Sequence, residues 1–381
     1  MNWNYGLELA RCIAIVLVLI SHGIHFLNSA DGTFGITVQS AFYYFLKPGW
    51  WGVRIFFALS GYLIGAQAIK ILNNKNISDA IHFTFRRWLR TIPTYWILLA
   101  AACLINNINF TSSEAISNAF FVQTINPESA SASSIISVSW SLAIEEWSYL
   151  IVSALIVILT ITKRRKSGNS SNYGARKILF LALVLAFAAL TLRTHWSLSS
   201  EFNWGALKKT APLQIDSLSA GLALAGVQAL RPGAFAKLCN QPISNMAISI
   251  TLMGMMGFII NEGYIHASSV STEMSLILSI ILYPASSLLS ALFLVSLWNY
   301  KPKNPRSITN KICGAIAATS YSLYMTHLWA MNIIERTVKS DNPYILFVAY
   351  IFLSFVIGLA CWLIAELPFL KVRDRLKTTK K

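Results

Sequence analysis

Ten apolar segments follow one another along the 381-residue chain and constrain its fold more than any other feature. They are residues 7–27, 50–72, 91–108, 141–162, 178–196, 211–230, 243–262, 273–298, 312–334 and 344–366. Segments of this length can cross a bilayer as α-helices, which satisfy their own backbone polar groups. The sequence therefore predicts an all-α, polytopic membrane helix bundle of about ten transmembrane helices. Because the segments account for most of the chain, we expect a single membrane domain, residues 1–381, with a short basic tail at 371–381.

Composition favours a membrane protein over a nucleic-acid-binding protein. Hydrophobic residues make up 55% of the chain and charged residues 12%, about half of what a soluble domain carries. Mean hydropathy is +0.56. The formal net charge of +16 would suit nucleic acid, but the basic residues lie in short loops, where they fix membrane orientation.

The distribution of charge between loops predicts the orientation. Basic residues gather in alternate loops and in the tail, at Lys75, Arg86, Arg87, Arg90, Lys163, Arg164, Arg165, Lys166, Arg176, Lys177, Lys301, Lys303, Arg306, Lys311, Lys371, Arg373, Arg375, Lys377, Lys380 and Lys381. The opposite loops are mostly acidic, with Asp31, Glu114, Glu128, Glu262 and Asp341, although Lys208 and Lys209 are an exception. Both termini are therefore expected to be cytoplasmic, with a flexible cytoplasmic loop at 163–177 and the longest external loop at 109–140.

The first apolar segment carries polar residues on one helical face. His22 lies eleven residues after Arg11, almost a whole number of turns, which places the two about 16 Å apart along one face. Glu8 joins the same face one turn earlier. Such residues are costly inside a membrane and are usually functional, and their presence argues against a signal peptide.

The orientation sorts the other polar residues into two expected layers. The outer layer contains His22, Arg54, Glu145, Glu146, Tyr324 and His327. The inner layer contains Arg11, Arg86, Arg87, Arg90, Glu366 and Arg373. A histidine beside a carboxylate is the usual arrangement for activating a hydroxyl, so His22 with Glu145 or Glu146 is a candidate catalytic pair.

Each of these groups also has a structural interpretation. Histidines hydrogen-bonded only for packing would explain His22 and His327, and ordinary carboxylates at a helix N-terminus would explain Glu145 and Glu146. Arg86, Arg87 and Arg90, in the loop before the third segment, suit a polyphosphate, but positive-inside charge or binding to anionic lipid explains them equally. Cysteines at positions 12, 103, 239, 313 and 361 are scattered, which indicates neither a metal site nor a disulfide framework.

Six motifs in order resemble acyltransferase family 3. They are Leu7–Arg11 followed by His22, Gly52–Ile64 (GVRIFFALSGYLI), Arg86–Trp96 (RRWLRTIPTYW), Ser139–Leu150 (SWSLAIEEWSYL), Ser320–His327 (SYSLYMTH) and Glu366–Pro368 (ELP). Each motif alone is weak, but together they cover the chain and are specific. The chain departs from the family at Arg54, where many members carry Asp, and we expect it to lack the extracytoplasmic domain that many members add.

The resemblance implies a bacterial inner-membrane enzyme that moves an acyl group, often acetyl, from cytoplasmic acetyl-CoA or another acyl-CoA to a hydroxyl. The implied acceptor is a surface polysaccharide such as lipopolysaccharide O-antigen, or its lipid-linked precursor. No bound cofactor, metal or nucleic acid is expected, and acyl-CoA, the glycan and membrane lipid are the expected partners.

The expected site residues follow from both arguments. The catalytic candidates are His22, Glu145, Glu146 and Glu366. The candidates for binding donor or acceptor are Arg11, Arg86, Arg87, Arg90, Tyr324 and His327. The two arguments conflict at Glu366, because depth in the membrane ranks it below Glu145 and Glu146 whereas the resemblance ranks it higher. For His22, a general base and a covalent acyl carrier both remain open.

Two other classes of protein fit the same pattern. A membrane transporter also carries ionisable residues near the midplane, although no internal repeat is visible. A non-catalytic subunit of glycan assembly would bind lipid-linked glycan without needing His22. Within the enzyme interpretation, a succinyl or other acyl donor is an alternative to acetyl.

Overall fold

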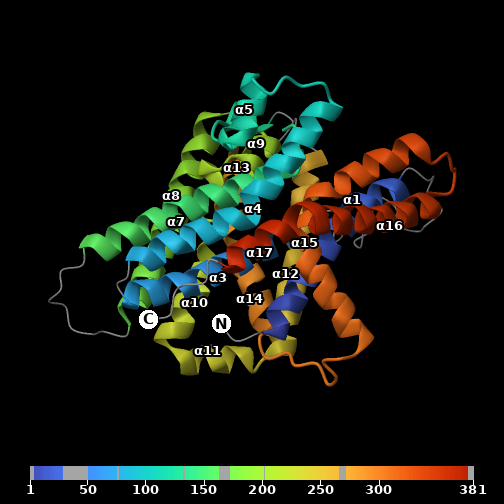
Figure 1. Cartoon of the computed structure of the whole chain (residues 1–381). Helices are drawn as coiled ribbons and strands as arrows, with labels where there is room; N and C mark the ends of the chain where they lie inside the picture. The colour runs from blue at the N-terminus through green and yellow to red at the C-terminus, as the bar shows by residue number, and fades with distance from the viewer. Residues whose placement is uncertain are drawn as a thin grey trace. The chain divides into compact units, whose positions relative to one another are not determined.

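The computed structural model describes residues 4–28, 50–74, 77–131, 134–162, 172–200, 202–265 and 272–375. These residues form helices joined by short connections, with no strand among them (Figure 1). Some sequence predictions fall outside the described residues, at least in part. They concern Lys75, external Asp31, residues 132–133 of the external loop, the flexible loop over residues 163–171 and the tail beyond residue 375.

In chain order, the helices are α1 (Tyr5–Asn28), α3 (Trp50–Asn74), α4 (Ile77–Ile105), α5 (Ser113–Ala119), η1 (Val122–Thr124), α6 (Pro127–Ser131), α7 (Ser139–Thr162), α8 (Tyr173–Ser199), α9 (Trp204–Lys209), η2 (Pro212–Gln214), α10 (Ser219–Leu230), α11 (Pro232–Cys239), α12 (Pro242–Ile265), α13 (Thr272–Ile277), η4 (Leu278–Leu282), α14 (Tyr283–Leu297), α15 (Ile308–Thr337), α16 (Pro343–Cys361), η5 (Trp362–Glu366) and α17 (Leu367–Arg375). The segments η1 and η2 are 3₁₀-helices, and η4 and η5 are π-helical.

Within the described residues, nine helical segments are long and apolar enough to cross a membrane. They match nine of the ten predicted spans and confirm an all-α, multi-pass membrane protein. The remaining predicted span, 312–334, lies within α15, a helix of 30 residues. This helix is less apolar because polar side chains such as Ser320, Thr326 and His327 interrupt it.

Helix α4 corrects one sequence prediction. The predicted span began at residue 91 and left Arg86, Arg87 and Arg90 in a loop, but α4 begins at Ile77 and carries all three arginines on the helix. Asp79 in its first turn suits the positive end of the helix dipole. Pro93 lies inside the helix, as membrane helices tolerate when neighbouring groups satisfy the freed carbonyl.

The described chain divides into two compact units. The first contains residues 1–59 and 236–362. Here α1 packs against α15, α16 and α14, and α12 packs against α14. A small residue also lets the start of α3 approach α1 closely, because a Cβ on Gly52 would lie 2.3 Å from the carbonyl oxygen of Ala14.

The second unit contains residues 60–235 and 363–381. In it α4 packs against α7 and α17, and α8 packs against α10. A fully buried ion pair joins Arg193 of α8 to Asp216, which lies between η2 and α10. Both guanidinium nitrogens are 2.8 Å from the carboxylate oxygens, and Nη1 also donates to the Leu213 carbonyl at 2.7 Å.

The orientation inferred from the basic loops leads to a direct prediction. A reporter fused at residue 170 is expected to signal the cytoplasmic side, and the same reporter fused at residue 125 the external side, because basic loops are retained inside. Alkaline phosphatase and green fluorescent protein, which are active on opposite sides of a bacterial inner membrane, provide the measurement. Equal signals from the two fusions would contradict this topology.

Candidate active site

The side chain of His22 is oriented by its own helix. Its Nδ1 lies 3.0 Å from the backbone carbonyl oxygen of Val18, one turn earlier on α1. A carbonyl oxygen only accepts hydrogen bonds, so Nδ1 must carry the proton and Nε2 of the neutral ring carries the lone pair. This tautomer gives the half-buried imidazole a basic nitrogen directed away from its own backbone.

A second histidine lies against the first. The ring centroids of His22 and His327 are 4.8 Å apart in an edge-to-face arrangement. His327 is fully buried, and its Nδ1 lies 2.7 Å from the carbonyl oxygen of Tyr324, so its Nε2 also carries a lone pair. Among the described residues no side chain or backbone group is hydrogen-bonded to that nitrogen.

Helices α1 and α15 bring these histidines together by packing in parallel along their length. Glu8 lies opposite Gly314, whose missing side chain leaves room for the Glu8 carboxylate. The thiols of Cys12 and Cys313 meet at the next turn, and His22 meets His327 further along. Glu8 and His22 therefore face the same neighbouring helix. The opening motif and the SYSLYMTH motif thus meet within the first unit.

Arg54 occupies an aromatic box in the same unit. Its guanidinium carbon lies 5.1 Å, 6.0 Å and 4.6 Å from the ring centroids of Trp50, Phe57 and Tyr283, and the residue is 3% exposed. Cation–π contacts of this kind stabilise a charge removed from water. The surroundings favour a structural role for Arg54, where the family often has Asp.

In the second unit, α4 and α7 bring arginines and carboxylates together. The Thr91 hydroxyl donates to Glu146 Oε1 at 2.6 Å, and the hydroxyls of Ser60 and Tyr149 both donate to Glu145 Oε1. The guanidinium of Arg87 lies 5.6 Å from the centroid of the Tyr149 ring and interacts electrostatically with both carboxylates.

This cluster corrects the prediction of two separate polar layers. The sequence placed Arg87 in an inner layer and Glu145 and Glu146 in an outer one, but the structure brings Arg87 within electrostatic reach of both carboxylates and against the ring of Tyr149, which binds Glu145. The physical reason is the early start of α4. The helix is about 44 Å long, longer than the ~30 Å hydrocarbon core, so its arginines extend along the α7 face instead of ending at the membrane surface.

Glu366 lies against the same part of α4. It ends the π-helical turn η5 and is 2% exposed. Pro368, two residues later, cannot donate to the carbonyl of Ile364 and clashes with it, which explains the widened turn. Thr94, less than one turn from the Thr91 that binds Glu146, donates to the carbonyl of Ala365 at 3.2 Å.

The position of Glu366 therefore removes the depth argument that ranked it below Glu145 and Glu146. All three carboxylates belong to elements that pack on the same stretch of α4. The resemblance, which ranked Glu366 higher, fits this arrangement better than the depth calculated from the sequence. Its catalytic role stays a prediction.

The arginines of α4 differ in their partners. Arg86 forms a long ion pair of 3.9 Å with Asp374, which also accepts from Arg373 at 2.9 Å. Arg87 is attracted by Glu145 and Glu146 and repelled by Arg90 and Arg373. Cations held close together in this way favour an anionic ligand that would relieve their repulsion.

The structure distributes the predicted site residues over both units. His22, Arg11, Tyr324 and His327 belong to the first, and the α7 carboxylates, the α4 arginines and Glu366 to the second. A pairing of His22 with Glu145 or Glu146 stays a prediction.

Sequence reasoning missed Ser60, Thr91 and Tyr149, which donate hydrogen bonds to the α7 carboxylates. Thr91, four residues after Arg87 and thus on the same face of α4, was the available signal. Among the described residues, no three His, Cys, Asp or Glu side chains are grouped so that they could hold a metal ion.

Comparison with known proteins confirms the resemblance. The acyltransferase domain of acyltransferase family 3 matches residues 4–365, and the chain therefore belongs to this family of acyltransferases. The chain is 30% identical over 183 residues to "Putative O-acetyltransferase SAS0844" of Staphylococcus aureus strain MSSA476 and, equally, to "Putative O-acetyltransferase SAR0937" of strain MRSA252. These matches cover 44% of this chain and 27% of each relative. No solved structure matches the chain.

Proposed function

We propose that this protein is an O-acyltransferase of the bacterial inner membrane. It moves an acyl group, most simply acetyl, from cytoplasmic acyl-CoA to a hydroxyl of a surface polysaccharide, such as O-antigen, or of its lipid-linked precursor. The observation that carries the proposal is His22 on a membrane-spanning helix of a family 3 acyltransferase domain, with Nδ1 bonded to Val18 and a basic Nε2. The names of the Staphylococcus relatives support acetyl as the group transferred.

In the proposed reaction, Nε2 of His22 accepts the proton of the acceptor hydroxyl as its oxygen attacks the thioester carbonyl. The thioester C–S bond then breaks, and the CoA sulfur leaves and takes the proton back from His22. His327 and Tyr324 line the same site and contact the substrate. A covalent acyl-histidine intermediate is the alternative route, in which the acyl group passes through Nε2 before reaching the hydroxyl.

The donor site of the proposal is the arginine cluster of the second unit, with Arg11 as a further substrate-binding candidate in the first. Phosphates of CoA carry the negative charge that offsets the repulsion of Arg87 by Arg90 and Arg373. Arg86 and Arg373 contribute less, because both are already paired with Asp374. The carboxylates Glu145, Glu146 and Glu366 orient the reacting groups or the arginines.

Removing an arginine that binds phosphate should weaken donor binding. Arg87→Ala and Arg90→Ala are each expected to reduce acyl-CoA affinity about 10- to 100-fold, because a charge-assisted hydrogen bond contributes roughly 1.5–3 kcal/mol. Lysine at either position should restore affinity only in part, since lysine lacks the planar fork. Binding of radiolabelled acetyl-CoA to protein in lipid nanodiscs measures the effect. Arg306→Ala, at an exposed position, is the matched control. Unchanged affinity in both α4 variants would mean that these arginines do not bind the donor and only help to set the orientation of the protein in the membrane.

The function is tested by transfer of label from [¹⁴C]acetyl-CoA to surface glycan in membranes with and without the protein. Mass spectrometry of the glycan then gives the mass and position of the added group and so separates acetyl from succinyl. A transporter would move acyl donor or glycan across the membrane without forming the ester. A non-catalytic assembly subunit would change the amount of glycan but not its acylation.

A further inference from the structure

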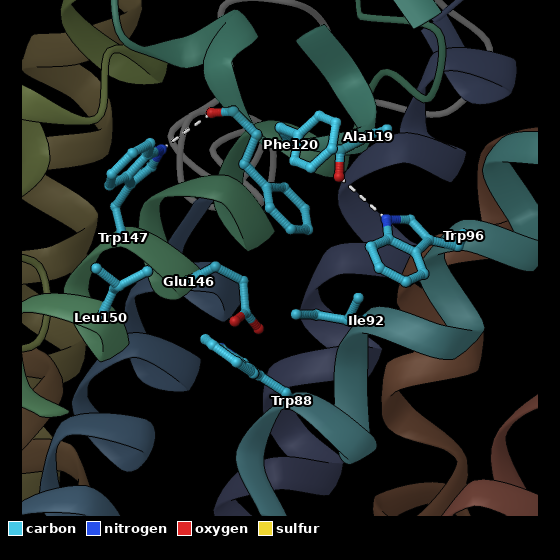
Figure 2. Close-up of a pocket in the computed structure, with 9 residues that line it drawn as sticks. Trp88, Ile92, Trp96, Ala119, Phe120, Glu146, Trp147 and Leu150 are labelled. Atoms are coloured by element: carbon cyan, nitrogen blue, oxygen red, sulfur yellow. Dashed lines mark hydrogen bonds between the residues drawn. The ribbon is translucent and has the colours of Figure 1, made fainter. Parts of the chain in front are cut away.

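A cavity of about 140 Å³ lies beside α4 and α7 in the second unit. Figure 2 shows its walls, which come from α4, from the chain around α5 and η1, and from α7. The lining residues are Trp88, Ile92, Trp96, Ala119, Phe120, Phe121, Glu146, Trp147 and Leu150. The indoles on α4 recur every two turns, so Trp88, Ile92 and Trp96 form one stripe on that helix. The pocket is therefore aromatic, with a single carboxylate.

One hydrogen-bond acceptor, Oε2 of Glu146, faces the cavity without a partner among the described residues. The indole nitrogens of Trp96 and Trp147 donate to the backbone carbonyls of Ala119 and Phe121, both at 3.0 Å, so these rings offer faces rather than N–H groups (Figure 2). Glu146 is 5% exposed, and among the described residues its Oε2 has no hydrogen-bond partner. In Figure 2, its carboxyl group lies above the ring of Trp88 and points into the cavity.

This combination selects the chemistry of a ligand. A buried carboxylate oxygen without a partner is costly, and a ligand hydroxyl that donates to it removes that cost. Aromatic faces are electron-rich and pack well against C–H groups that carry a slight positive charge. A sugar ring presents both features, because one face of a pyranose is made of C–H groups and its edge carries hydroxyls.

The rim of the pocket indicates what is attached to that ring. Trp96, Phe120 and Leu150 are 50%, 65% and 47% exposed. Trp96 and Leu150 belong to helices that are long and apolar enough to cross a membrane, where such side chains contact hydrocarbon. A ligand in this pocket therefore has a hydrocarbon part at the rim and a hydroxyl-bearing part inside.

We propose that this pocket binds the sugar ring of a lipid-linked glycoside, with the ring stacked on indole faces and one hydroxyl donating to Glu146 Oε2. The proposal rests on the proposed function, since it gives the acceptor of acyl transfer a site on α4 and α7. It assigns Trp88, Trp96 and Trp147 to substrate binding, for which the sequence motifs offered no chemical role.

The test is photolabelling of the full-length protein in phosphatidylglycerol nanodiscs with an alkyl glucoside that carries a diazirine on its alkyl chain. Peptides of α4, α5 and α7 are expected to be labelled, and excess octyl glucoside should remove the label whereas excess octanol should not. Glu146→Gln, which replaces one carboxyl oxygen by an amide nitrogen at nearly constant volume, is expected to lower this labelling at least tenfold.

A matched pair of leucines on α7 provides the steric control. Leu150 lines this pocket, and Leu159 lines a second cavity of about 140 Å³ that contains neither tryptophan nor carboxylate. Leu150→Trp should block labelling of the pocket, whereas Leu159→Trp should leave it unchanged. Monodisperse elution of both variants from a size-exclusion column shows that they are folded.

Three outcomes would overturn the proposal. Equal competition by octanol would mean that the pocket holds only hydrocarbon. Stronger labelling by the matching alkyltrimethylammonium probe would identify a cation site formed by the same rings. Labelling that persists in folded Leu150→Trp and in Glu146→Gln would place the glucoside elsewhere. None of these measurements uses an acyl donor, so absence of acyl transfer would count against the proposed function alone.

Discussion

Replacing His22 by alanine is expected to lower acyl transfer by at least 100-fold while leaving the protein inserted and abundant. A positioned general base typically contributes about 10²- to 10⁴-fold to the rate, and alanine offers no group that can take the hydroxyl proton. His22→Gln should be nearly as inactive, because its amide keeps hydrogen-bonding capacity but cannot accept a proton. Transfer from labelled acetyl-CoA to glycan in membranes, normalised to protein level, provides the measurement.

His25 is the matched control on the same helix. It lies three residues later, and its side chain is 63% exposed and 3.4 Å from Glu335. His25→Ala removes an imidazole from α1 without touching His22 or His327, so transfer should stay close to that of the unmodified protein. Substantial transfer by His22→Gln would exclude His22 as the base. Loss of folded protein in both His22 variants, with His25→Ala intact, would instead indicate a packing role for His22.

The helices were largely predictable from the sequence because hydrophobicity alone decides which segments can enter a membrane. Nine of the ten predicted spans correspond to apolar helices long enough to cross it. The errors lie where helix continues past the apolar segment. Helix α4 starts fourteen residues before the predicted span, at Ile77 instead of residue 91, because an amphipathic stretch with arginines extends the same helix.

The site was predictable as a set of residues but not as an arrangement. Motif spacing identified His22 and His327, and the structure shows their rings in contact. The depth assigned to Arg87, Glu146 and Glu366 failed, because it assumed that each polar residue lies as far into the membrane as its distance from the end of an apolar run. Side-chain pairs between distant residues decide the arrangement. Thr91 and Glu146, for example, are 55 positions apart, and no local sequence pattern predicts their contact.

The pocket on α4 and α7 could not be predicted from the sequence, because its walls also come from residues far apart in the chain. Trp88 and Trp96 fall in the motif at residues 86–96 and Trp147 in the motif at residues 139–150, but the spacing of these residues does not show that they line one cavity. Their role as walls of one cavity depends on the chain around α5 and η1 folding back over α4, where Ala119 and Phe121 accept hydrogen bonds from the indoles. The same is true of Arg193 and Asp216, which lie 23 positions apart and pair only in the folded chain.

Breaking the Arg193–Asp216 pair is expected to destabilise the protein more than any other single substitution considered. Asp216→Asn removes the negative charge at nearly constant volume and leaves a guanidinium buried in the second unit, with an expected cost of about 3–5 kcal/mol. On a membrane-spanning helix such a buried charge cannot be stabilised by hydration. The temperature at which half of the detergent-solubilised protein is lost from the monodisperse peak should fall by about 10 °C.

The controls separate the loss of the pair from the loss of a charge. Glu114→Gln removes a carboxylate from the exposed face of α5 and should leave that temperature unchanged. The double variant Arg193→Met with Asp216→Leu replaces the pair by apolar groups and should recover most of the stability, because no charge is then left unpaired. If the double variant were as unstable as Asp216→Asn, the hydrogen bond from Arg193 to the Leu213 carbonyl, rather than the ion pair, would be what fixes α8 to the turn before α10.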